Sequence, residues 1–103
     1  MNLGDIQKEV HGVATDHGWW EAQEVPAFFY IPEKIALIHS ELSEALEEYR
    51  TEGEPTAHFA EEMADVVIRV MDLCEHLGIS LEDAILAKTE KNKLRPYRHG
   101  KVC

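Results

Sequence analysis

Two acidic pairs stand out in this sequence, because the two carboxylates of each pair are three residues apart. Glu41 and Glu44 form the first pair, and Glu62 and Asp65 form the second. Residues i and i+3 lie on the same side of an α-helix, one turn apart. If two such helices pack side by side, the carboxylates converge and repel each other unless a cation lies among them. The spacing therefore predicts a metal site shared by two helices.

The types of residue at this predicted site favour a hard divalent cation. Mg²⁺ takes six oxygen ligands and usually combines a few carboxylates with water and substrate phosphate. A di-iron carboxylate bundle would need a Glu-x-x-His motif, and the sequence contains none. Softer metals would need clusters of Cys or His, which the sequence also lacks. We expect Mg²⁺, with Mn²⁺ as the alternative.

The charge of the chain changes sign near its C-terminus. Residues 1–87 hold 4 Lys/Arg and 19 Asp/Glu, for a net charge of −15, whereas residues 88–103 hold 6 Lys/Arg and one Glu, for +5. An acidic body disfavours a nucleic acid polymer as a partner, because such binding depends on basic contacts to phosphate. A basic segment suits the phosphate oxygens of a small ligand. The candidate substrate-binding residues in this segment are Lys88, Asn92, Arg95 and Tyr97.

Five of the eight aromatic residues lie in the stretch 18–31, which we expect to be a loop. A long loop in a small domain is usually functional. Aromatic rings can stack on any nucleobase, or they can cover the core or an interface between subunits. Packing is the preferred interpretation for Phe28 and Phe29.

Apolar residues with helical spacing predict four helices that would position these groups. The expected helices begin after Asn2, at Pro32, near Thr56 and after Ser80, and they end at Gly18, about Arg50, Gly78 and Pro96. In the last helix the residues expected to face inward are Leu81, Ala84, Ile85 and Leu94. We predict a single all-α domain over residues 1–103, a four-helix bundle. Because so small a domain has a thin core, we also expect a homodimer or homotetramer.

Nothing in the sequence indicates a membrane or an export route. The chain has no run of about 18 apolar residues, as a membrane span would need. Its first residues lack the basic start and apolar stretch of a secretion signal. Two cysteines are too few for a disulfide framework. The expected location is therefore the cytoplasm, with no membrane partner.

Taken together, these motifs resemble a known family. Glu41-x-x-Glu44, then 17 residues, then Glu62-x-x-Asp65 is similar to the paired motif of the MazG-like all-α nucleoside triphosphate pyrophosphohydrolases. The sequence Glu-Glu-Met-Ala-Asp-Val-Val-Ile-Arg around the second pair, and the segment from Lys88 to Lys101, also resemble that family. The resemblance covers about residues 17–101.

The resemblance implies a MazG-like bundle that cleaves the bond between the α- and β-phosphates of a nucleoside triphosphate, giving a monophosphate and pyrophosphate. Such an enzyme would clean or scavenge the nucleotide pool. The implied Mg²⁺ ligands are Glu41, Glu44, Glu62 and Asp65, and Glu41 and Glu44 are equal candidates for the residue that orients the attacking water. The resemblance further implies that Lys88 and Asn92 bind the substrate, that Trp20 contacts the base, and that subunits complete each other's sites.

Two other functions stay open at this point. The chain could be a non-enzymatic helical module that binds a partner helix or assembles into an oligomer. It could instead hydrolyse a phosphoribosyl nucleotide, as enzymes with a similar bundle do in histidine synthesis.

Overall fold

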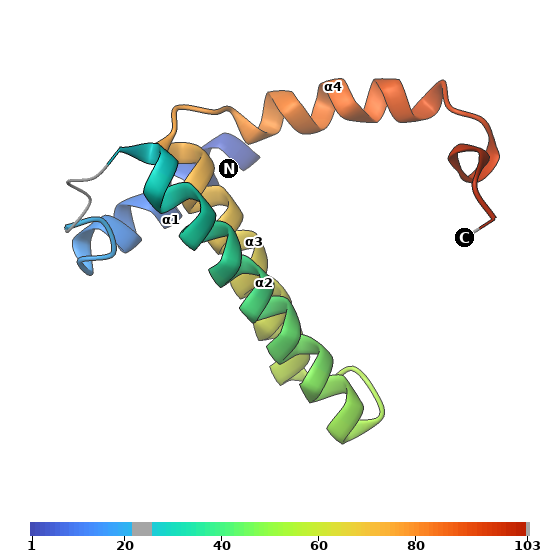
Figure 1. Ribbon diagram of the computed structural model, residues 1–103, viewed down its shortest axis with the longest axis horizontal. Coiled ribbons are helices and arrows are strands. Elements are labelled where there is room, and N and C mark those ends of the chain that lie inside the picture. Colours follow the sequence, from blue (N-terminus) through green and yellow to red (C-terminus); the bar gives the residue numbers. More distant parts are fainter. Residues whose placement is uncertain (22–25, 103) are drawn as a thin grey trace.

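The computed structural model describes residues 1–21 and 26–102, and all regular secondary structure in this part of the chain is helical. It forms four α-helices and one short 3₁₀ helix, without a strand among the described residues (Figure 1). The elements are α1 (Leu3–Asp16), α2 (Ala27–Glu52), α3 (Ala57–His76), α4 (Leu81–Lys93) and the 3₁₀ helix η1 (Tyr97–Gly100). The all-α prediction is confirmed.

Local capping chemistry fixes most helix ends where the sequence predicts them. At the start of α1, the Asn2 side chain accepts a hydrogen bond from the Asp5 backbone N–H at 2.8 Å, and the Asp5 carboxylate accepts one from the Asn2 N–H at 3.1 Å. This reciprocal pair is a capping box. The side chains of Thr56 and Ser80 cap α3 and α4 in the same position. Gly53 ends α2 in the left-handed conformation, with φ of 76°.

The start of α2 differs from the prediction. The helix begins at Ala27, so Pro32 lies inside it and is not its first residue. A proline inside a helix removes one backbone hydrogen bond, here the bond to the Phe28 carbonyl. The expected loop is correspondingly shorter, and its residues 22–25 lie outside the described residues. Phe28 and Phe29 are on the helix surface, 81% and 63% exposed.

Helices α2 and α3 form an antiparallel pair along most of their length, and α1 packs against α3 (Figure 1). Gln7, 3% exposed, ties α1 to the junction between α3 and α4. Its amide donates to a Glu75 carboxylate oxygen at 3.0 Å and to the Ile79 carbonyl at 2.8 Å. The buried apolar side chains of the described residues are Trp20, Ala45, Met71 and Leu73. The core is therefore small, as expected from the length.

Helix α4 does not close the bundle within one chain. Its first turn is anchored, because the Leu81 N–H donates to Gln7 and the Glu82 carboxylate accepts from the Leu3 N–H. Beyond that turn the chain leads away from α2 and α3 (Figure 1). The prediction of an inward face on α4 is wrong for one chain, because Ile85 is 46% and Leu94 88% exposed. No element of the described part of the chain covers them.

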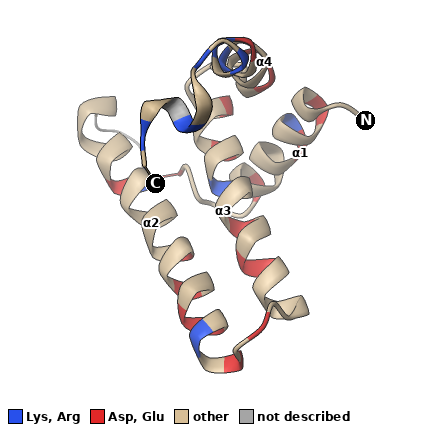
Figure 2. Ribbon diagram, turned by 90° about the vertical axis from the view of Figure 1, so that its right-hand side faces the viewer, with Lys and Arg blue, Asp and Glu red and all other residues tan. Residues whose placement is uncertain are grey.

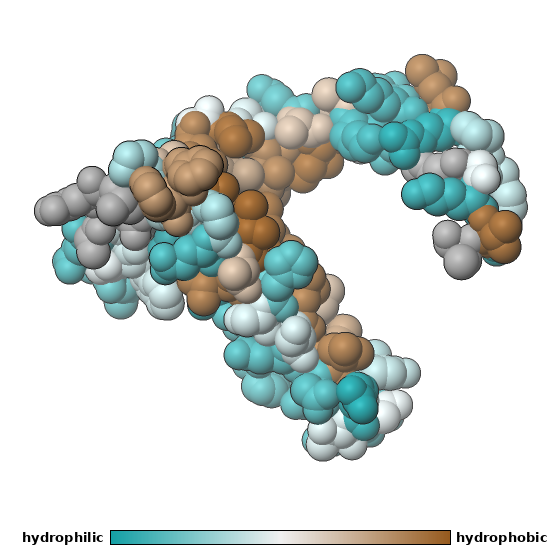
Figure 3. All heavy atoms as spheres, in the orientation of Figure 1, coloured by the Kyte–Doolittle hydropathy of each residue, from teal (hydrophilic) through white to brown (hydrophobic). Residues whose placement is uncertain are grey.

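Apolar side chains are also exposed on the α2–α3 pair. They include Leu42, Leu46 and Tyr49 on α2 and Met63 and Val67 on α3, which are between 40% and 56% exposed. Figure 3 shows apolar areas along this pair and near the C-terminal end of the chain, beyond α4. Among the described helices, none combines the length and hydropathy needed to cross a bilayer.

Candidate metal centre

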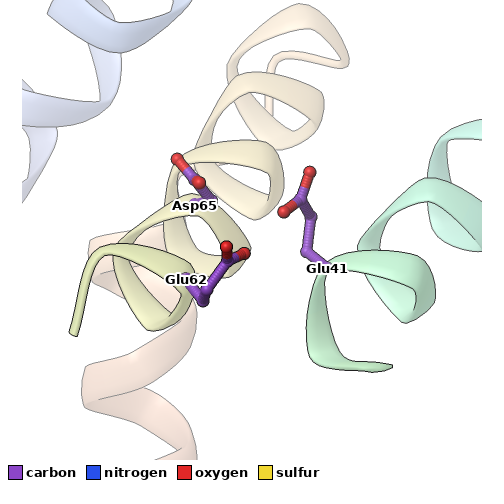
Figure 4. A group of neighbouring side chains, drawn as sticks. All are labelled: Glu41, Glu62 and Asp65. Carbon is purple, nitrogen blue, oxygen red and sulfur yellow. The ribbon is translucent and has the colours of Figure 1, made fainter. Parts of the chain in front are cut away.

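Three of the four predicted carboxylates meet between α2 and α3. Glu41 comes from α2, and Glu62 and Asp65 come from α3, one turn apart (Figure 4). One carboxylate oxygen from each lies within 4.8 Å of the others. Glu41 is buried, Glu62 is half-buried and Asp65 is exposed, so the group opens to solvent on one side. We call these three residues the acidic cluster.

Glu44 lies at the rim of this cluster. Its pKa is raised above the ordinary value of 4.5, chiefly by the negative charge of Glu41, then by desolvation and by the charge of Glu62. Hydrogen bonds with Glu62 and Glu41 contribute in the same direction. Such shifts arise when carboxylates share a site. The fourth predicted carboxylate therefore lies beside the cluster, on its exposed edge.

Glu62 contains the feature that best fits a bound cation. Among the described residues, its Oε2 is the buried side-chain oxygen that has no hydrogen-bond partner. The other oxygen, Oε1, lies 3.4 Å from Nε2 of His58. Leaving a buried carboxylate oxygen without a partner costs free energy. A cation held by these carboxylates would remove that cost, and an all-oxygen set of ligands suits Mg²⁺.

Arg69 partly neutralises the cluster, and sequence reasoning did not select it. Its Nε donates to Oε1 of Glu41 at 2.8 Å, and its guanidinium lies 5.1 Å from the ring centre of Trp19. Both partners are largely buried, with Arg69 27% and Glu41 11% exposed at the side chain. The sequence feature that could have identified Arg69 is its spacing, because Arg69 is four residues after Asp65 and therefore lies on the same side of α3.

A pocket of about 250 Å³ lies directly beside the acidic cluster. Glu41 and Asp65 belong to its wall as well as to the cluster. The rest of its polar and aromatic lining comes from Trp19, Trp20, Lys34, Arg69 and Asp72. We call it the side pocket. Small-molecule sites combine apolar and aromatic walls with a few polar groups that orient the ligand. Because Glu41 and Asp65 are part of the pocket wall, a ligand in this pocket would reach their carboxylates.

Trp20 forms part of this wall and is buried, at 9% exposure. Its indole N–H donates to Oδ1 of Asp72 at 2.9 Å. His76 stacks on it with a centroid distance of 3.6 Å and an interplanar angle of 5°, so one face of the indole is covered. The ammonium of Lys34 lies 4.5 Å from the ring centre. Trp19, half exposed, presents more of its ring to solvent.

His76 gives a pH dependence that can be measured. Burial lowers its pKa below the ordinary 6.5; the charges of His11 and Lys34 lower it further, and Asp72 opposes them. Because the folded state then binds this proton more weakly than the unfolded state, the free energy of unfolding falls as the pH drops below 6.5. We expect urea unfolding to show this loss in the wild type and less of it in His76→Gln. The exposed His39→Gln is the matched control, and equal losses in all three would contradict the assignment.

The structure does not bring the predicted basic residues to the acidic cluster of the same chain. Lys88 and Asn92 lie on α4, Arg95 follows that helix, and Tyr97 begins η1. All four are exposed. They belong to the segment 88–102, which we call the basic arm, and which leads away from α2 and α3 (Figure 1). Figure 2 shows the Lys and Arg positions of this segment in blue.

Comparison of the chain with protein-family models, with curated proteins and with solved structures finds no match.

Proposed function

We propose that this protein is a Mg²⁺-dependent nucleoside triphosphate pyrophosphohydrolase that cleaves the α–β phosphate bond and serves to clean or scavenge the cytoplasmic nucleotide pool. The observation that supports this most strongly is the acidic cluster, where Glu41, Glu62 and Asp65 converge within 4.8 Å from two helices. The side pocket, of about 250 Å³, adjoins this cluster, and its wall includes Trp19 and Trp20. A metal site for phosphates and a pocket for the base would then lie next to each other.

In this proposal Glu41, Glu62 and Asp65 hold Mg²⁺, with Glu44 as a fourth ligand or as a group beside the metal, and Mn²⁺ can substitute. When bound, such a cation neutralises phosphate oxygens and lowers the pKa of coordinated water. Of the two catalytic candidates, Glu41 already binds Arg69 inside the cluster. Glu44 stands at the exposed edge with a raised pKa, which suits a residue that orients the attacking water and accepts its proton.

The basic arm gives the second element of the proposal. Its exposed residues Lys88 and Asn92, with Arg95 and Tyr97, reach the acidic cluster of another copy of the chain, where they bind the triphosphate. The opposite charges of the arm and of residues 1–87 favour this contact. The exposed apolar side chains of the α2–α3 pair and of α4 would be covered in the same homodimer or homotetramer.

Thermal melting separates this proposal from a non-enzymatic helical module, which the exposed apolar surface would also suit. A ligand at 100 times its dissociation constant stabilises the folded state by about 2.7 kcal/mol. We expect Mg²⁺ to raise the melting temperature of the wild type, and Mg²⁺ with a non-hydrolysable nucleoside triphosphate to raise it further. Asp65→Asn should lose most of the Mg²⁺ shift.

The outcomes of this melting experiment are distinct. An unchanged melting temperature with Mg²⁺ and with every nucleotide would favour the helical module. A shift with a phosphoribosyl nucleotide alone would favour the phosphoribosyl-nucleotide pyrophosphohydrolase. Asp16→Asn, an exposed residue at the end of α1, is the charge-matched control and should keep the full shift.

A further inference from the structure

The side pocket contains a carboxylate that the proposed hydrolysis does not use. Asp72 lies on α3 and lines the pocket, and its side chain is 16% exposed. Its Oδ1 lies 2.9 Å from Nε1 of Trp20 and 2.7 Å from Nδ1 of His11. An indole N–H can only donate, so Oδ1 of Asp72 accepts the hydrogen bond from Trp20. The short contact to His11 is a hydrogen bond when Nδ1 of His11 carries the proton. Two groups from other parts of the chain therefore hold this carboxylate in place.

The second oxygen of Asp72 is not used in this network. Oδ2 makes no hydrogen bond to any residue that the structure describes, and it is not a fully enclosed atom. A carboxylate oxygen in such a position is an acceptor for a ligand in the pocket. Since both bonds to Oδ1 fix the group's orientation, the acceptor is placed before any ligand binds.

A donor stands in the same pocket. The Lys34 ammonium has three N–H groups, and among the described residues it donates one long hydrogen bond, 3.4 Å to the Trp19 carbonyl. It therefore keeps hydrogen-bonding capacity toward a ligand. Glu41 and Asp65 mark the part of the pocket wall that belongs to the acidic cluster. A nucleotide with its phosphates at the cluster would place its base among Asp72, Lys34 and the two tryptophans.

We propose that Asp72 selects the base of the nucleotide by accepting a hydrogen bond from an exocyclic amino group next to a ring nitrogen acceptor, as in cytosine and adenine. Lys34 supplies the donor for that ring nitrogen. Uracil and hypoxanthine present a carbonyl oxygen where these bases have the amino group, and a carboxylate repels it. The inference rests on the proposed nucleotide site and names the class of nucleotide bound there.

The magnitude follows from measured base discrimination. A well-placed pair of hydrogen bonds to a base edge contributes about 1–3 kcal/mol of discrimination, which is about fivefold or more in affinity. We therefore expect dCMP to bind at least about fivefold more tightly than dUMP, and dAMP more tightly than dIMP by a similar factor.

Calorimetric binding of these four monophosphates, in the presence of Mg²⁺, tests the inference without relying on hydrolysis. Asp72→Asn should reduce the dCMP:dUMP affinity ratio to about one or reverse it, because Asn can keep an acceptor toward Trp20 and His11 while its amide N–H₂ faces the pocket. Asp16→Asn should keep the wild-type ratio. Equal wild-type affinities for dCMP and dUMP, no binding of either, or an unchanged ratio in Asp72→Asn would each overturn the inference.

A ligand-side experiment covers the case in which Asp72→Asn does not fold. The monophosphate of 2-pyrimidinone deoxyriboside lacks only the amino group of dCMP and should bind the wild type at least about fivefold more weakly than dCMP. Equal binding would overturn the inference. Pyrophosphate release from nucleoside triphosphates is measured separately, so an inactive protein that still prefers dCMP would refute the proposed hydrolysis and leave base selection supported.

Discussion

Replacing Glu44 by Gln is expected to abolish pyrophosphate release and, at the same time, to raise the melting temperature of the metal-free protein. The loss of activity should be at least about 100-fold, the low end for removal of a general base. The gain in stability follows from the raised pKa of Glu44. An ionised Glu44 is disfavoured in the folded state by Glu41 and Glu62, so a neutral amide relieves repulsion at pH 7. Pyrophosphate release and thermal melting measure the two effects.

The sign of the stability effect can be checked against pH. Below the ordinary pKa of 4.5, Glu44 is protonated in both the folded and unfolded states, so the advantage of Glu44→Gln should disappear there. The control is Glu47→Gln, one turn further along α2, whose carboxylate forms an exposed ion pair with Arg50 at 3.2 Å. That variant should retain activity and gain no stability. Near-normal turnover in Glu44→Gln would show that the catalytic assignment is wrong.

Mixing two inactive variants is expected to restore activity, if the basic arm serves a site on another subunit. Lys88→Ala lacks one predicted substrate-binding cation of the arm, whereas Glu44→Gln lacks one carboxylate beside the cluster. Half of randomly mixed dimers are heterodimers, and each of these contains one site with both native groups. The mixture should therefore show about a quarter of wild-type activity. Co-refolding of the two variants followed by a pyrophosphate assay measures it.

The outcome of mixing depends on where the arm binds, so it separates two arrangements. An arm that folds back on its own cluster leaves every site in the mixture with one defect, and the activity stays at the level of the single variants. The control is Lys91→Ala, which removes an exposed charge on α4 outside the predicted site. This variant should retain activity by itself, which would show that losing any one charge of the arm does not abolish activity. Sedimentation of the wild type as a monomer would contradict the arrangement directly.

The helix ends were largely predictable, because they depend on contacts within a few residues. The capping box of Asn2 and Asp5 and the caps at Thr56 and Ser80 are local hydrogen bonds, and a sequence pattern contains both partners of each. The start of α2 was mispredicted for a related reason. Proline is common at the first position of a helix, but Pro32 lies inside α2, and the sequence pattern did not distinguish the two cases.

Burial was less predictable than helicity. On α3 the apolar residues Met63 and Val67 are 40% and 48% exposed, whereas Met71 and Leu73 are buried. An amphipathic pattern shows that a face can be covered and does not say by which part of which chain. The same reason explains α4, whose apolar residues lie exposed on a helix that leaves the bundle.

By itself, the sequence determined that the chain is helical and that Glu62 and Asp65 share one side of a helix, because both properties repeat every few residues along the backbone. Only the tertiary structure decided that Glu41 from another helix joins them, that Arg69 binds Glu41, and that His11 and Trp20 hold Asp72. The paired residues of the Arg69, His11 and Trp20 contacts are separated in the sequence by 28, 61 and 52 positions, respectively. They depend on how whole helices pack, which no local spacing encodes.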